Sequence, residues 1–286
     1  MTVAESLESG IGSRTRPKLS RAAQGAALVI VGVGAVALLA PVLPLDDPIR
    51  GELSERLSGP GYRHPLGTDG QGRDVLSRLV WGARPSMLAA LLPVLIGGSI
   101  GASLGLIAGL IGRTTGAVIM RFLDIFYAFP AVLLAIAIST TRGAGLTTMV
   151  ISIAVIVVAP VARIAETEVR AIRNLDFMEA ARASGAPTWM IAVRQVVPCV
   201  APALIVYCTA LVGLSLVYAA GLGFIGLGLA PPDPEWGTMV NELRSFTFSH
   251  PWLAVIPAVV ILSVSVAFNV LGDGLRDRLA VGRSDG

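Results

Sequence analysis

Long apolar runs separated by short polar segments dominate the sequence. Six runs approach the roughly 20 residues that an α-helix needs to cross about 30 Å of hydrocarbon. We expect these spans at residues 22–44, 86–112, 117–138, 146–162, 196–216 and 252–271. The pattern predicts an all-α, polytopic membrane protein with six transmembrane helices. An even number of spans leaves both termini on one side of the membrane.

Composition agrees with this class and excludes others. Hydrophobic residues make up 54% of the chain and charged residues 14%, whereas soluble proteins carry about 25% charged residues. The net charge of +3 is spread over many loops, so no nucleic-acid partner is indicated. Cys199 and Cys208 share one apolar run and form neither a disulfide framework nor a metal motif. We therefore expect no metal ligand in this chain.

The basic residues predict an orientation. With the N-terminus inside, 14 of the 22 Lys and Arg residues fall in inner segments, as the positive-inside rule requires. These are Arg14, Arg16, Lys18, Arg21, Arg113, Arg121, Arg163, Arg170, Arg173, Arg182, Arg194, Arg276, Arg278 and Arg283. The first apolar run is longer than the core of a secretory signal peptide, which favours a retained span. Both termini are expected in the cytoplasm.

These assignments divide the chain into segments. A cytoplasmic tail (1–21), a first span (22–44) and an extracytoplasmic loop (45–85) precede a five-helix core (86–272) and a cytoplasmic tail (273–286). The core includes a cytoplasmic loop at 163–198 and an extracytoplasmic loop at 230–251. Val75, Leu76, Leu79 and Val80 share one helical face, so the end of the first outer loop is expected to form a helix on the membrane surface. A folded external cap without lipid contact is the alternative interpretation.

One polar stretch interrupts the apolar pattern and predicts two short helices. Its residues are Glu179-Ala-Ala-Arg-Ala-Ser-Gly185-Ala-Pro187, and Val196-Val-Pro198 follows. The first five residues are good helix formers, Gly185 suits a left-handed C-cap, and Pro187 suits the first turn of a new helix. A plain cytoplasmic hairpin between two spans is the alternative interpretation.

This stretch resembles the "EAA" loop of bacterial ABC importer permeases, with Val196-Val197 in place of the usual Ile-Leu. The resemblance implies a coupling loop, here residues 163–198, that docks on a separate ATPase subunit. The motif positions carried over are Glu179, Ala180, Ala181, Gly185, Ala186 and Pro198.

Three further segments resemble the dipeptide, oligopeptide and nickel permeases. They are His64-Pro-Leu-Gly-Thr-Asp69 with Gly72-Arg-Asp74, the segment Phe224–Gly237, in which Ile225 replaces the family's Leu, and Phe268–Asp277. Together they point to the second, C-type permease subunit and to the type I ABC importer permease fold. A metal site at His64 is the alternative interpretation of the first segment, and a turn-rich structural loop is favoured.

Small and charged residues within the spans suggest packing roles. Gly97, Gly101, Gly105 and Gly109 recur every four residues and predict a face that another helix approaches closely. Arg121 and Asp124, three residues apart, are expected to pair on one helix face. No residue stands out as a solute ligand.

The resemblance implies a transmembrane subunit that moves peptides or related small solutes without catalytic residues of its own. Its partners would be a homologous second permease, two ATPase subunits, an extracytoplasmic solute-binding protein and membrane lipids, in a bacterial plasma membrane. Lys18 is the only lysine, so the chain has no P-loop of its own, and ATP and Mg would be bound by the ATPases. The alternatives are an ATPase-independent secondary transporter and an intramembrane enzyme.

Overall fold

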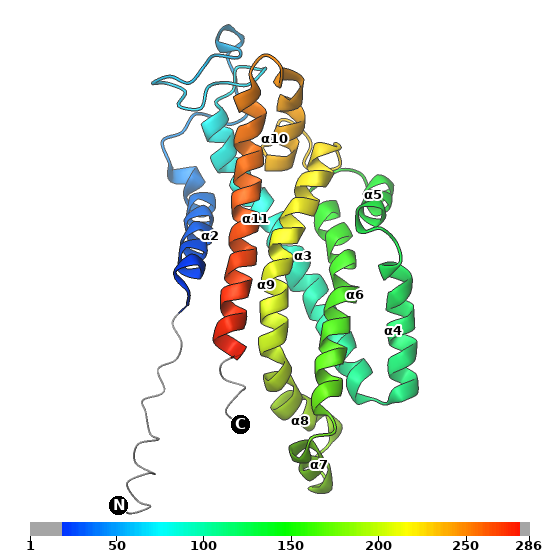
Figure 1. Cartoon of the computed structure of the whole chain (residues 1–286). Helices are drawn as coiled ribbons and strands as arrows, with labels where there is room; N and C mark the ends of the chain where they lie inside the picture. Colours follow the sequence, from blue (N-terminus) through cyan, green and yellow to red (C-terminus); the bar gives the residue numbers. More distant parts are fainter. Residues whose placement is uncertain (1–18, 281–286) are drawn as a thin grey trace, which may run out of the picture.

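The computed structural model describes residues 19–280 and folds them into a bundle of long helices (Figure 1). The α-helices are α2 (Arg21–Leu39), α3 (Val75–Leu110), α4 (Arg113–Tyr127), α5 (Ala131–Arg142), α6 (Leu146–Ile172), α7 (Asp176–Ala183), α8 (Thr188–Ile191), α9 (Val197–Phe224), α10 (Trp236–Leu243) and α11 (Pro251–Ala280). Short 3₁₀ turns lie at Ala40–Val42, Leu53–Glu55 and Arg244–Phe246. The all-α prediction is confirmed for this part of the chain; the expectations for residues 1–18 and 281–286 lie outside it.

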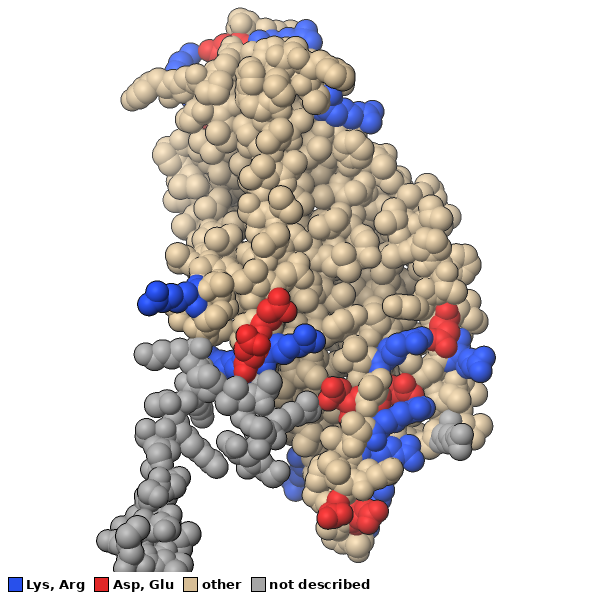
Figure 2. Space-filling model, in the orientation of Figure 1, with Lys and Arg blue, Asp and Glu red and all other residues tan. Residues whose placement is uncertain are grey.

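The long helices are suited to a bilayer. Among the described residues, 5 helices are long and apolar enough to cross a membrane, and the count reaches 6 when the bent pair α4–α5 is taken as one span. Figure 2 shows charged side chains at the two ends of the molecule, with an uncharged band between them on the face in view. The structure therefore agrees with five or six spans, and the predicted number of six is reached only if the bent pair α4–α5 crosses the membrane as one span.

That third span was expected as one helix over 117–138, and this expectation is wrong. α4 and α5 are separated by Ala128, Phe129 and Pro130 and are bent by 81° relative to each other. Pro130 has no amide hydrogen, and its ring disfavours a helical conformation at Phe129. The apolar run is continuous in sequence, but the helix is not.

α3 differs from expectation in the opposite direction. It is a single helix of 36 residues, about 54 Å long, so the expected boundary at residue 85 and the separate surface helix before it have no counterpart. Asp74 caps its start by accepting a hydrogen bond from the Ser77 amide, 2.6 Å away. Val75, expected to face lipid, is buried against Leu243 and Leu253. The outer end of α3 is thus held in protein rather than on the membrane surface.

The four-residue glycine repeat lies against α6. A Cβ added at Gly97, Gly101 or Gly105 would lie 2.2–2.4 Å from the carbonyl oxygen of Ala154, Val158 or Ala162 respectively. A Cβ at Gly109 would lie 2.6 Å from Val169 Cβ. The two backbones therefore approach as closely as small residues allow, which is how helices associate without a hydrophobic driving force in lipid.

The last spans are longer than the hydropathy pattern indicated. The fifth was expected at 196–216, yet helical structure runs from Thr188 to Phe224 through a π-helical turn at Ala192–Val196. That turn directly precedes Pro198, which lies at the start of α9. Inserted π turns change the backbone hydrogen-bond register without ending a helix. α11 likewise continues to Ala280, so residues 273–280 are helical rather than a tail.

Gly105→Ala should destabilise the bundle by about 1–3 kcal/mol, because the new methyl group meets backbone that cannot move cheaply. Gly32→Ala in α2 is the control, since a Cβ there meets nothing within 4 Å and alanine favours a helix. Thermal unfolding of both variants in detergent, followed by tryptophan fluorescence, measures the difference. Equal midpoints for the two variants would contradict the close contact between α3 and α6.

Candidate functional site

The expected coupling loop forms one end of the molecule (Figure 1), which we call the inner end after the predicted orientation. α7 lies beyond the end of α6, and α8 lies beside that end, where it leads into α9 (Figure 1). Asp176 and Glu179 lie in the first turn of α7 and Arg182 in its last turn, a charge order that the helix dipole favours. Gly185 follows with φ +77°, a left-handed conformation that residues with a Cβ adopt only at a cost. The helix, stop and second helix expected from the sequence are present.

One side of the coupling loop is anchored in the protein. Met178 is fully buried and Ala181 nearly so, within a cluster that includes Val169 and Ile172 of α6 and Val200 of α9. Ala186 packs on the same cluster. The cluster therefore packs α7 against the inner ends of both α6 and α9.

The other side of the coupling loop is exposed. Glu179, Ala180, Gly185 and Pro198 are all exposed to solvent. Large apolar side chains are exposed beside them, at Leu175, Phe177, Trp189 and Val193, and Trp189 is 67% exposed. Exposed apolar groups among charged ones are typical of a protein–protein contact. The motif residues thus separate into an anchored pair, Ala181 and Ala186, and an exposed set.

The opposite end of the molecule is an outer cap, residues 44–74 and 225–250. Buried pairs of charged side chains hold it together. Arg73 Nε lies 2.6 Å from Asp69 Oδ2, and both side chains are almost fully buried. Glu242 Oε2 on α10 accepts hydrogen bonds from Arg73 Nη2 at 2.8 Å and Arg78 Nη2 at 2.7 Å. Arg78 also donates to the backbone carbonyls of Pro48 and Pro232. This ion cluster joins the first outer loop, α3 and α10.

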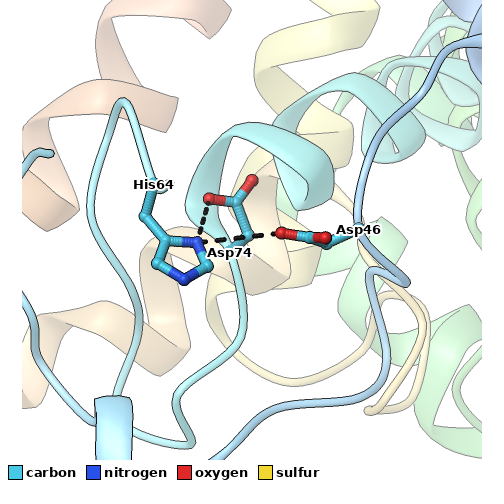
Figure 3. A group of neighbouring side chains, drawn as sticks. All are labelled: Asp46, His64 and Asp74. Atoms are coloured by element: carbon cyan, nitrogen blue, oxygen red, sulfur yellow. Dashed lines mark hydrogen bonds and ion pairs between the residues drawn. The ribbon is translucent and has the colours of Figure 1, made fainter. Parts of the chain in front are cut away.

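His64 adds a second polar cluster to the outer cap (Figure 3). Its Nδ1 lies 3.0 Å from Asp74 Oδ1 and 3.9 Å from Asp46 Oδ2, and its Nε2 lies 2.9 Å from Glu55 Oε2. Burial lowers the pKa of His64, but hydrogen bonds to Asp74 and Glu55, together with their charges, outweigh burial and raise that pKa overall. Both ring nitrogens are thus engaged by carboxylates, and an imidazolium would donate to both.

Glu235 fixes α10 in the outer cap. This buried carboxylate accepts hydrogen bonds from the amides of Gly237 and Thr238 at 2.8 and 2.9 Å, the geometry of an N-cap. Burial raises the pKa of Glu235, and the hydrogen bonds it accepts oppose that rise. The neighbouring Trp236 donates its indole N–H to the carbonyl of Leu79 on α3, 2.9 Å away. α10 is therefore attached directly to the outer part of α3.

The chain has an exposed helical loop at one end and a cap at the other, and its sequence matches a known family. Residues 101–281 match the family described as "Binding-protein-dependent transport system inner membrane component", which is well over half of the chain. The chain belongs to this family.

Similar proteins agree with this assignment. The glutathione transport system permease protein GsiD of Pectobacterium atrosepticum is 38% identical over 258 residues, covering 90% of this chain and 86% of that protein. GsiD of Shigella flexneri is 40% identical over 258 residues, covering 90% and 85%. A chain of the inward-facing MetNI methionine ABC transporter has a TM-score of 0.60 at 19% identity, covering 73% of this chain and 98% of that one. That likeness shows the fold, which is the expected type I permease fold.

The protein is therefore a permease subunit of a binding-protein-dependent ABC importer, a multi-pass component of the inner membrane. Such subunits are non-catalytic, so the enzyme alternative is not supported. The alternative of an ATPase-independent secondary transporter also finds no support among the relatives.

Two ionic features of the permease escaped sequence reasoning. Asp124 pairs with Arg163 of α6 rather than with Arg121, because the broken third span brings α4 alongside α6. The partner of the cap arginines, Glu242, is 164 residues away from Arg78 in the chain. The loop motif that contains Asp69 and Arg73 could have indicated an ion cluster, but it does not include the third partner, Glu242.

Arg78→Leu should destabilise the permease by about 3–5 kcal/mol, because it leaves the carboxylates of Asp69 and Glu242 to share the single positive charge of Arg73. Arg50→Leu is the matched control, since the Arg50 side chain is 89% exposed in its pair with Asp47 and exposed pairs contribute little. The midpoint of thermal unfolding in detergent should fall for Arg78→Leu alone. Equal unfolding midpoints for Arg78→Leu and Arg50→Leu would show that the ion cluster does not stabilise the permease.

Proposed function

We propose that this permease pairs with a homologous second permease and works with two ATPase subunits and an extracytoplasmic solute-binding protein to import peptides or related small solutes. ATP and Mg would be bound by the ATPases. The names of the GsiD relatives support a peptide-type solute, since glutathione is a tripeptide. The coupling loop carries the proposal, because it exposes large apolar residues among charged ones at one end of the bundle.

The proposed orientation places the coupling loop and both termini in the cytoplasm. The arginine distribution supports it, because Arg163, Arg170, Arg173, Arg182 and Arg194 all lie on or beside the coupling loop. The outer cap would then face the binding protein. The buried ion pairs of Arg73 and Arg78 join the parts of the outer cap, so the cap would present a fixed surface to the binding protein.

The coupling loop would transmit ATPase motion through packing. Nucleotide-driven closure of the ATPases would displace α7, and Met178 joins α7 to the inner ends of α6 and α9. α6 in turn contacts α3 along the glycine repeat. A partner shifts the balance between inward-open and outward-open states only by its difference in affinity for them. The exposed face of the coupling loop is where that difference would arise.

Gly185 offers the first test of this function. Gly185→Val should reduce ATPase association and transport while leaving membrane insertion intact, because a β-branched residue resists the positive φ that ends α7. Gly185→Asn is the control, since asparagine tolerates that conformation and a Cβ at this site meets nothing within 4 Å. Pull-down of each form from mild detergent, followed by ATPase assay of the bound fraction, gives the comparison.

If ATPases co-purify with the intact chain and with Gly185→Asn but are depleted with Gly185→Val, the proposal is supported. If the intact chain purifies without any ATPase and still moves solute in proteoliposomes, the proposed function is wrong.

Trp189 tests the docking surface independently of backbone conformation. Trp189→Ala should weaken ATPase binding about tenfold or more, as expected when a central aromatic contact is removed. Trp252→Ala is a matched control, because Trp252 lies at the outer end of α11 and is also partly exposed. Binding of purified ATPase to immobilised permease measures both. An unchanged affinity for Trp189→Ala would show that this side chain lies outside the contact.

A further inference from the structure

A cavity of about 380 Å³ lies where the break between α4 and α5 faces α6 and α9. Its wall includes Tyr127 and Phe129 beside the break, Pro160 on α6, and Tyr207, Ser215 and Tyr218 on α9. Its volume is within the range of small-molecule binding sites. Neither the coupling loop nor the outer cap contributes to it.

The cavity lies at the middle depth of the bundle. On α6 its lining residues fall at 155–160, near the centre of a helix that spans Leu146–Ile172. On α9 they fall at 207–218, within the central part of Val197–Phe224. Helices of these lengths cross the hydrocarbon with their centres near its midplane. Any polar group in the cavity wall is therefore far from both aqueous faces.

The broken helix is better suited to an aqueous or protein-lined space than to lipid. The first amides of a helix have no partner within it, and at the start of α5 the N-cap residue Pro130 provides no side-chain hydrogen bond. Irregular backbone at membrane depth is tolerated only where protein buries it or where it lines an aqueous space. Phe129 at the break is 57% exposed, so protein does not bury it in this chain.

Tyrosines are concentrated in this cavity. The whole chain has four tyrosines, and Tyr127, Tyr207 and Tyr218 all line it. Within the described part of the chain, these three hydroxyl groups form no hydrogen bond with protein groups. Polar groups at such a depth are costly unless they meet a polar partner. The three hydroxyls in this wall are therefore available to water or to a polar solute that enters the cavity.

The chemistry of the wall defines that ligand. No charged side chain lines the cavity. Asp124 and Arg163 pair with each other beside it, where the Arg163 guanidinium lies 5.2 Å from the centre of the Tyr127 ring. Aromatic and aliphatic walls suit apolar side chains, and tyrosine hydroxyls suit amide and carboxyl groups. A bare metal ion would lack carboxylate or imidazole ligands in this wall.

We propose that Tyr127, Tyr207 and Tyr218 form a solute-contact subsite in the translocation path, which receives a short peptide with apolar side chains. This proposal rests on the proposed function, since the second permease would close the side on which Tyr127 and Phe129 are exposed. Phe126 and Ser215 complete the wall of the subsite.

Accessibility to a charged reagent tests the aqueous cavity without requiring transport. Tyr207→Cys and Tyr218→Cys are made separately in a Cys199→Ala, Cys208→Ala background, and membranes are treated with a membrane-impermeant maleimide with and without ATP. Both cysteines should react in at least one condition. Leu28→Cys is the control, because Leu28 is 74% exposed on the apolar surface of α2 and should stay unreactive in lipid. Reactivity no greater than that of the control overturns the proposal.

Transport kinetics test the hydroxyl groups. Proteoliposomes of the assembled importer are given a tritiated dipeptide, Ala-Phe, with the binding protein. The double variant Tyr207→Phe, Tyr218→Phe should raise the apparent KM several-fold and leave ATPase association unchanged, because only polar contacts to the solute are lost. Tyr62→Phe, at the fourth tyrosine on the exposed outer cap, should transport normally.

The outcomes separate the two proposals. Wild-type KM and rate in the double variant would overturn the subsite while leaving the importer function in place. Absence of ATP-dependent import by the intact complex would count against the proposed function, and the maleimide result would still decide whether the cavity is aqueous.

Discussion

The close contact between α3 and α6 is the constraint on which the rest of this permease depends. In lipid, the transfer of an apolar side chain from lipid contact to contact with another helix releases little free energy. Helices therefore associate through close backbone contact. Gly97, Gly101 and Gly105 provide it, each with α6 backbone at a distance that a methyl group would occupy. α6 is consequently the most buried of the candidate spans, with 61% of its apolar 18-residue stretch buried. Other helices pack around this pair.

Both ends of the molecule are built onto that pair. The outer part of α3 carries Arg78 and accepts the Trp236 hydrogen bond, so α10 and the outer cap are attached to it. The inner end of α6 contributes Val169 and Ile172 to the cluster that anchors α7. The outer cap and the coupling loop, which are the proposed contact surfaces for the binding protein and the ATPase, are thus connected through the contact between α3 and α6. Alternating access requires such a connection, because each partner must sense the state of the other end.

The sequence predicted the spans, the glycine contact face and the coupling loop because each is encoded locally. The broken third span was missed for a physical reason. Pro85, Pro93, Pro160, Pro202 and Pro257 all lie inside continuous helices, and Pro130 alone separates two of the spanning segments. Whether a proline breaks a membrane helix depends on which neighbours satisfy the freed backbone groups, and these neighbours are distant in sequence. The tyrosine cavity was missed for the same reason, since its walls come from four helices.

The ion cluster of the outer cap has a consequence for biogenesis. Arg73 and Arg78 emerge from the ribosome long before Glu242, which follows Arg78 by 164 residues. The cluster has two carboxylates, Asp69 and Glu242. Until α10 is in place, Arg73 and Arg78 have only Asp69 as a partner, although the finished cap buries both arginines. An incomplete chain therefore cannot close its cap and leaves charged, unpaired surface outside the membrane. Closure of the cap therefore depends on synthesis of the chain at least as far as Glu242.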